Sequence, residues 1–380
     1  MGVYVHIPFC EHKCSYCDFH SIVVGDAESF SRLVDSYLVS LRREALYYRE
    51  LWGERPLQTL FFGGGTPSLL PPEKLASFIC FLRQELPFTA EPEITIEANP
   101  HSLTEQGAEI LASAGVNRVS LGAQAFQDHL LQAIGRKHVT AQIAESVGML
   151  RRAGIENINL DLMFGLPGQG LPEWRDSLEQ ALALEPAHLS CYALTLEPGT
   201  PLATWQKAGL VQLPGEDEQA DMYDLARRLL QRAGYEHYEI SNFSLPGRRC
   251  EHNLLYWHNH PFIGLGSGAA GYVNGCRYVN APDVQAHIQT WERGQPRYVQ
   301  CEQLTIDQQM DETMMVGMRL LEGVAEEYFR LRFKVSYRDV YQEAIDELAA
   351  RGLVEQVGGR LRVTERGLLL ENQVSAAFLR

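Results

Sequence analysis

The strongest constraint on the fold of this chain is an alternation of strand-like and helix-like segments along its first half. Strand-like apolar or β-branched runs recur six times, over Val3–His6, Thr59–Phe62, Glu93–Glu97, Arg118–Leu121, Asn157–Met163 and His188–Leu194. Segments of helical periodicity separate them, over Phe30–Leu51, Pro72–Leu86, Thr104–Ala114, Thr140–Ala153 and Leu171–Leu184. This order predicts an α/β fold with a mainly parallel sheet, either doubly wound or a complete or partial β/α barrel.

The pattern changes in the second half of the chain. After a helix predicted over Asp217–Ala233 and a strand near Tyr235–Ile240, a Gly-, Asn- and aromatic-rich stretch predicts a long loop region over Ser241–Asn280. Further on, helices followed by a hairpin about Gly358-Gly359 resemble a winged-helix element. We therefore expect three parts, namely a barrel over 1–240, a loop-rich connecting region over 241–300, and a helical winged-helix-like part over 301–380.

Charge and composition exclude several classes of protein. The 33 basic and 48 acidic residues give a net charge of −15, which repels nucleic acids and anionic lipid surfaces. A hydrophobic fraction of 45% is ordinary for a globular chain, and no apolar run approaches the roughly 18 residues of a membrane span. The opening MGVYVHIPFC lacks the features of a signal peptide. We expect a cytoplasmic protein with no nucleic-acid partner and no integral membrane segment.

Three cysteines, Cys10, Cys14 and Cys17, form a C-x3-C-x2-C motif just after the first predicted strand. A loop this short can direct three sulfurs at an iron–sulfur cube, which leaves one iron without a protein ligand. Zinc is the alternative, because a structural zinc site takes four ligands and nearby histidines could complete the set, namely His6, His12 or His20. A zinc-stabilised scaffold without a redox role therefore remains a hypothesis.

The cysteine motif and the strand–helix alternation together resemble the radical S-adenosylmethionine (radical SAM) superfamily. Longer segments, YVHIPFC from Tyr4, FGGGTP from Phe62 and DLMFGLP from Asp161, are similar to its oxygen-independent coproporphyrinogen oxidase branch and occur in the same order. This resemblance implies a partial (β/α)6 barrel and a 4Fe-4S cluster on the three cysteines. It also implies S-adenosylmethionine as a cofactor, and an electron donor as a partner.

The resemblance also implies a set of residues that contact S-adenosylmethionine. The glycines after the second strand, Gly64 and Gly65, would meet its amino group, and Thr66 would add a hydroxyl. The remaining implied contacts include two on the ribose or adenine side (Glu97 and Gln124), one with the carboxylate (Arg136), and further residues at Tyr4, Tyr16 and Asp161.

Two features depart from the oxidase pattern. Phe19 stands where that branch has a fourth cysteine, and only nine residues precede Cys10, so coproporphyrinogen oxidation is placed in doubt. The second feature is H-N-x-x-Y-W, a motif similar to that of HemW-type haem chaperones, at His252, Asn253, Tyr256 and Trp257. Histidine is a standard axial ligand of haem iron, and aromatic rings offer flat surfaces to a macrocycle.

The same motif residues could instead tie down and plug a long loop, and His258 and His260 lie close enough to be iron ligands too. Our leading hypothesis from the resemblance is a haem chaperone, with His252 on the haem iron, that transfers haem to acceptors such as respiratory haemoproteins. The alternatives are an oxygen-independent coproporphyrinogen III dehydrogenase and the zinc scaffold. Whether the chain is an enzyme stays open at this point.

Overall fold

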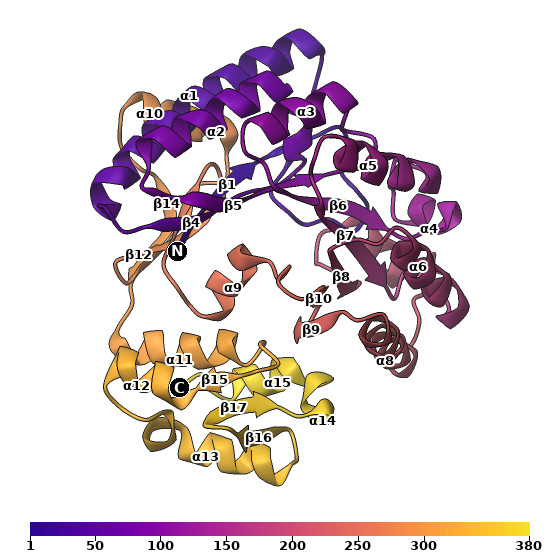
Figure 1. The fold of residues 1–380 in the computed structure, drawn as a ribbon, viewed down its shortest axis with the longest axis vertical. Helices are drawn as coiled ribbons and strands as arrows, with labels where there is room; N and C mark the ends of the chain where they lie inside the picture. The colour runs from indigo at the N-terminus through magenta and orange to yellow at the C-terminus, as the bar shows by residue number, and fades with distance from the viewer.

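The predicted alternation forms one large curved sheet in a computed structural model that describes residues 1–380 (Figure 1). Six strands that follow the predicted order pair in parallel at its centre, and they are β1 (Gly2–Ile7), β4 (Leu57–Gly64), β5 (Phe88–Ala98), β6 (Arg118–Gln124), β7 (Asn157–Phe164) and β8 (His188–Ala193). The expected α/β fold with six parallel barrel strands is confirmed.

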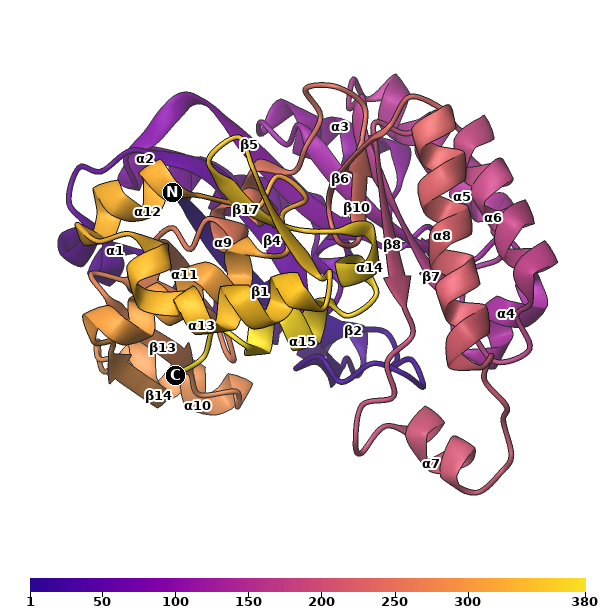
Figure 2. The same ribbon diagram turned by 90° about the horizontal axis from the view of Figure 1, so that it is seen from below.

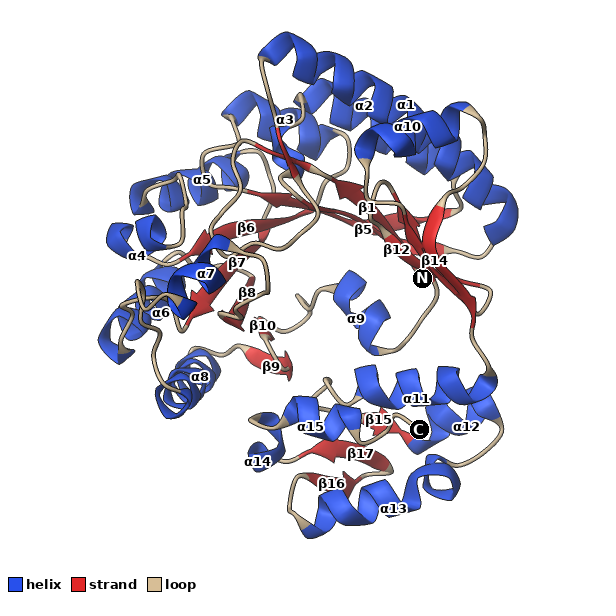
Figure 3. Ribbon diagram, turned by 180° about the vertical axis from the view of Figure 1, so that it is seen from behind, coloured by secondary structure: helices blue, strands red, loops and turns tan.

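Helices cover the convex side of this sheet (Figures 1 and 3). The main ones are α1 (Ala27–Trp52), α2 (Pro72–Glu85), α3 (Glu105–Ser113), α5 (Thr140–Arg152), α6 (Leu171–Ala183) and α8 (Glu216–Arg232). Each buries an apolar stripe against the strands, and large side chains such as Trp52 and Trp174 are almost fully buried there. Three short helices were not predicted, namely η1 (Pro67–Leu69), α4 (Asp128–Ala133) and α7 (Pro201–Lys207), of which α7 projects from one edge in Figure 2.

The prediction of a long loop over Ser241–Asn280 was wrong. The stretch from 236 to 303 contains β9 (Glu236–Glu239), β10 (Asn242–Ser244), α9 (Glu251–Trp257), β11 (Phe262–Leu265), β12 (Ala270–Val273), β13 (Cys276–Asn280), α10 (Val284–Glu292) and β14 (Tyr298–Gln303). Strand β11 pairs in parallel with β1 and is followed outward by β12, β13 and β14, while β10 and β9 extend the opposite edge, so the sheet has twelve strands. These strands are only three to six residues long, so local pattern alone does not reveal their long-range pairing.

The C-terminal part confirms the expected helices and hairpin. It contains α11 (Ile306–Gly317), β15 (Val324–Ala325), α12 (Glu326–Phe333), α13 (Tyr337–Ala350), β16 (Val354–Val357), β17 (Arg360–Val363), α14 (Glu365–Leu368) and α15 (Glu371–Ala376). Its three strands form a separate small sheet in the order β15-β17-β16. The part lies across the open side of the curved sheet, with α9 between the two (Figures 1 and 3). The domain boundaries at 240 and 300 stay a proposal.

No helix of the structure combines the length and the apolar character needed to span a bilayer.

Candidate functional site

A cavity of about 340 Å³ lies at the carboxyl ends of the central strands, which is where β/α barrels place their active sites. It brings together most of the predicted residues, which come from segments spread over the first half of the chain. The predicted residues that line it are Cys10, Cys14, Tyr16, Cys17, Gly64, Gly65, Thr66, Glu97, Gln124, Arg136 and Asp161. The sequence-based expectation of one site at the strand ends is therefore met for these residues.

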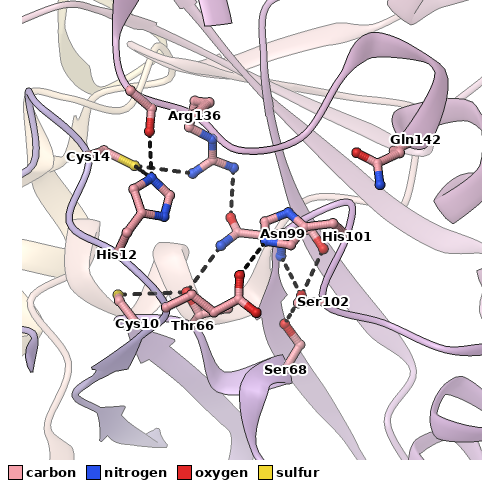
Figure 4. A network of polar contacts seen from close by, with 12 residues as sticks. Cys10, His12, Cys14, Thr66, Ser68, Asn99, His101, Ser102, Arg136 and Gln142 are labelled. Carbon is pink, nitrogen blue, oxygen red and sulfur yellow. Dashed lines mark hydrogen bonds and ion pairs between the residues drawn. The ribbon is translucent and has the colours of Figure 1, made fainter. Parts of the chain in front are cut away.

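The cysteine loop is held against the barrel by a small parallel sheet of β2 (Phe9–Cys10) and β3 (Ile22–Val23). Hydrogen-bond donors point at two of its sulfurs. The Thr66 hydroxyl lies 3.7 Å from the Cys10 sulfur, and Arg136 Nη1 lies 3.9 Å from the Cys14 sulfur (Figure 4). Donors to sulfur stabilise thiolates, which are the form that binds iron. The loop therefore fits a cluster held by three thiolates.

The cysteine loop does not form a site for a single metal ion. No three His, Cys, Asp or Glu side chains in the structure converge closely enough to hold one ion. Zinc requires its sulfur ligands at about 2.3 Å from a common centre. The geometry of the loop thus lends no support to the zinc scaffold.

The glycines after β4 pass directly beneath the cysteine loop. The pairing of β1 with β4 sets His6 beside Gly63 and Ile7 beside Gly64. Gly64 has a φ of 109°, and a Cβ there would lie 2.4 Å from the His6 ring. At Gly65 a Cβ would lie 2.6 Å from the Phe9 carbonyl oxygen. Only glycine fits at these two positions, because a side chain would meet the chain's own atoms.

Arg136 is fixed by a polar network that sequence reasoning missed in part (Figure 4). Its Nη2 donates to Asn99 Oδ1 at 2.7 Å and to the Gly122 carbonyl at 2.6 Å, and Asn99 Nδ2 donates to Thr66 Oγ1 at 3.1 Å. The Arg136 Nε–H is buried and has no partner in the chain. A buried unpaired donor on a guanidinium fits an anionic ligand group such as a carboxylate. Asn99 could have been found as a polar residue directly after β5.

Two carboxyl groups, Glu97 and Asp161, face the cavity from neighbouring strand ends. Glu97 accepts a hydrogen bond from the Gly64 N–H at 3.0 Å, and Asp161 accepts from Ser120 at 2.9 Å and Asn159 at 2.8 Å. Burial, followed by repulsion from Asp161, raises the pKa of Glu97 to about 7. Burial also raises the pKa of Asp161, although its hydrogen bonds oppose the shift.

The raised pKa of Glu97 predicts a dependence of stability on pH. A carboxyl whose pKa is higher in the folded state holds its proton more tightly there, so its contribution to stability is full below the unfolded pKa and is lost as the pH rises through about 7. The Glu97→Gln variant keeps an acceptor for Gly64 but carries no charge. We expect it to exceed the native chain in free energy of unfolding by about 2 kcal/mol at pH 8, and by little at pH 5.

Urea denaturation of the chain without S-adenosylmethionine at the two pH values measures this difference. A Glu97→Gln variant whose advantage is the same at both pH values would contradict the raised pKa.

Tyr4 is the one predicted S-adenosylmethionine residue that does not line the cavity. Its hydroxyl lies 3.0 Å from His6 Nδ1, and its ring stacks near Phe61 with a centroid separation of 6.2 Å. The ring centroid of His252 lies 6.5 Å away. Tyr4 therefore lies between the cavity and His252 of the H-N-x-x-Y-W motif. Its contact with S-adenosylmethionine stays a prediction.

The H-N-x-x-Y-W motif lies on a helix, α9, and not on a loop. The Glu93 carboxylate accepts hydrogen bonds from the backbone N–H groups of Glu251 and His252, both at 3.1 Å, at the amino end of this helix. A carboxylate at this end compensates unpaired N–H groups and the helix dipole. The anchored helix lies between the sheet and the C-terminal part (Figure 1), and its last two residues are Tyr256 and Trp257.

His252 is 1% exposed, and both of its ring nitrogens are occupied. Nδ1 lies 2.7 Å from the Thr59 hydroxyl, and Nε2 lies 2.9 Å from the Tyr256 hydroxyl. Whichever nitrogen carries the proton, the other accepts a hydroxyl hydrogen, so no lone pair is free for iron. The predicted role of His252 as an iron ligand would require the ring to leave both partners.

The other three residues of the H-N-x-x-Y-W motif lie in different surroundings. Tyr256 packs edge-on against Phe262 at 4.8 Å between ring centroids, and the Trp257 ring lies under the Arg319 guanidinium at 4.7 Å. Asn253 is partly exposed. The motif residues therefore lie on more than one side of α9, and the structure does not gather all four around one cavity.

Comparisons with known proteins decide the family. The Radical SAM superfamily profile matches residues 4–181, and the HemN C-terminal domain profile matches residues 304–370. "Heme chaperone HemW" of Lactococcus lactis is 38% identical over 378 residues, covering 100% of this chain and 97% of the relative. The protein of the same name from Bacillus subtilis is also 38% identical, over 100% of this chain and 99% of the relative. This chain belongs to the HemW family.

Among solved structures, the coproporphyrinogen III oxidase HemN of Escherichia coli, described as a radical SAM enzyme, superposes with a TM-score of 0.85. It is 23% identical and covers 99% of this chain and 89% of that chain, so the likeness shows the shared fold alone. Membership of the HemW family and of the radical SAM superfamily confirms the resemblance inferred from the cysteine, glycine and H-N-x-x-Y-W motifs. An iron–sulfur cluster and S-adenosylmethionine are the cofactors of that superfamily, and the cavity residues fit both.

Proposed function

We propose that this chain is a haem chaperone, which binds haem and transfers it to acceptor haemoproteins. The observation that carries the proposal is the 38% identity to "Heme chaperone HemW" along 97% of that relative's length. The H-N-x-x-Y-W motif on α9, which is similar to that of the HemW-type haem chaperones, supports the same function.

We further propose that the cluster is of the 4Fe-4S type, bound by Cys10, Cys14 and Cys17, with S-adenosylmethionine beside it. When bound, such a cluster supplies the single electron that splits the sulfonium of S-adenosylmethionine. The chain's own residues hold the ligand in place. Gly64 and Gly65 admit its amino group to the backbone, and Arg136 meets its carboxylate, which fits the unpaired Nε–H.

The remaining proposed contacts with S-adenosylmethionine come from strand ends around the same cavity. Carboxyl and amide groups suit the hydroxyls and ring nitrogens of an adenosyl group. The residues concerned are Tyr16, Thr66, Glu97, Gln124 and Asp161.

The two alternative functions lack a supporting observation. Phe19, which replaces a cysteine of the oxidase branch, is 60% exposed and offers no sulfur to the cavity it borders. The structural likeness to coproporphyrinogen oxidase shows a fold and no activity. The zinc scaffold lacks a set of converging ligands.

We also propose where the chaperone works and which proteins it works with. We propose that it works in the cytoplasm, receives electrons for its cluster from a separate donor protein, and delivers haem to respiratory haemoproteins. The net charge of −15 favours acceptors that present a basic surface.

Haem transfer tests the proposed function directly. The haem-loaded chain, prepared without oxygen, is mixed with the haem-free form of a b-type respiratory subunit. The absorption of the acceptor should develop in proportion to the haem supplied, and it should develop faster than with free haem at the same concentration. A rate equal to that with free haem would contradict a chaperone role.

A further inference from the structure

The turn that follows α9 carries two imidazole groups that no other part of the chain uses. The rings of His258 and His260 lie 5.6 Å apart between centroids, and both residues are partly exposed. None of their ring nitrogens is buried or hydrogen-bonded within the chain. This differs from His252, whose two nitrogens are both occupied by hydroxyl groups. Accessible imidazole nitrogens are standard ligands of haem iron.

The turn is held rigidly by the C-terminal part. Tyr328 donates its hydroxyl hydrogen to the His258 carbonyl at 2.6 Å, and Arg332 Nη1 donates to the Asn259 carbonyl at 2.8 Å. The Asn259 side chain donates to the Thr313 hydroxyl at 3.1 Å, and its backbone has a φ of 49°. Asn259 is therefore a left-handed residue held through both its carbonyl and its side chain, which is the kind of strained position that proteins keep at binding sites.

Side chains that can bind the carboxylate groups of a ligand lie around the turn. A second cavity, of about 200 Å³, lies between α9 and the C-terminal part and is lined by Trp257, His258 and Tyr328 among others. Its lining also includes the Glu322 carboxylate, whose charge is paired with Arg360 at 2.7 Å. The Trp257 Nε1–H is buried and has no hydrogen-bond partner. Arg332 donates only to carbonyl and hydroxyl oxygens, so no carboxylate neutralises its charge. An unpaired buried donor and an uncompensated cation complement an anionic ligand, and haem carries two propionate groups.

We propose that in this chain the haem iron is bound by His258 or His260 of the turn, with the propionates directed to Arg332 and the Trp257 Nε1–H. This inference rests on the proposed haem-chaperone function and names the ligands of its haem. His252 is then a positioning residue, which ties α9 to the sheet through Thr59.

Haem titration of histidine variants tests the assignment. Ferric haem is added without oxygen to the cluster-loaded native chain and to three variants, namely His258→Gln with His260→Gln, His252→Gln, and His129→Gln. His129 is an exposed residue of α4, far from the turn, and serves as the matched control. The readouts are the Soret difference spectrum, the electron paramagnetic resonance of the ferric haem, and the unfolding temperature.

We expect the double variant to bind haem at least about tenfold more weakly and to lose the spectrum of histidine-ligated haem. His252→Gln and His129→Gln should keep that spectrum. A double variant with a native spectrum would overturn the inference, as would loss of the spectrum in His252→Gln at an unchanged unfolding temperature.

Two further outcomes of the haem titration can be distinguished from these. If the double variant does not fold, the single variants His258→Gln and His260→Gln decide, and a native spectrum in both would overturn the inference. Failure of the native chain itself to bind haem would refute the proposed function and not merely the ligand assignment.

Discussion

Replacing Cys14 with alanine is expected to abolish assembly of the iron–sulfur cluster. Its sulfur borders the cavity between Arg136 Nη1, at 3.9 Å, and His12 Nε2, at 3.8 Å, and only two other cysteines border the same cavity. With two thiolates left, the cluster loses a ligand that no neighbouring cysteine can replace. Iron and sulfide per chain after anaerobic reconstitution should fall close to zero, and cleavage of S-adenosylmethionine by a chemical reductant should be lost with them.

The control is Cys80→Ala, which removes an exposed thiol from α2, outside the cavity. It should leave iron, sulfide and cofactor cleavage at native levels. A Cys14→Ala variant that still assembles a full cluster would contradict the proposed ligand set.

Replacing Gly65 with alanine is the second change with a large expected effect. The added Cβ would lie 2.6 Å from the Phe9 carbonyl oxygen and 2.9 Å from that of Ile7, and neither backbone atom can move aside easily. The Gly65 N–H donates to Ile7 and the Thr66 N–H donates to Phe9, both at 2.8 Å, so the same shift loosens the cysteine loop. We expect a loss of about 1–3 kcal/mol in the free energy of unfolding and much weaker binding of S-adenosylmethionine.

Chemical denaturation and equilibrium binding of S-adenosylmethionine measure the two effects. Gly25→Ala is the control, because a Cβ at Gly25 meets no atom within 4 Å and the residue lies just after the same loop. Native stability and native affinity in Gly65→Ala would contradict the proposed role of the glycine segment in binding S-adenosylmethionine.

Most of the barrel could be predicted from sequence because its signals are local. Strands such as β7 carry apolar residues at alternating positions, and helices such as α5 combine an apolar stripe with a glycine after the C-terminal end. The cysteine motif and FGGGTP also lie within short windows. Parallel pairing then brings them together, since the carboxyl ends of parallel strands meet at one edge of the sheet.

The rest could not be predicted, because it depends on contacts between distant segments. Strand β11 is four residues long and gains its place only by pairing with β1, some 260 residues earlier in the chain. Asn99 becomes part of the site only when Arg136 reaches it. The motif at His252 indicated the family correctly, yet its pattern could not reveal that Thr59 and Tyr256 occupy both ring nitrogens.

The central claim is that this chain binds haem specifically, and its most direct test is an anaerobic titration of the cluster-loaded protein with haem, followed by Soret absorption. The account predicts a saturable change that ends near one haem per chain, with the iron and sulfide content of the cluster unchanged. A Soret change that grows without saturation, or that matches the change seen with an unrelated acidic protein, would contradict it.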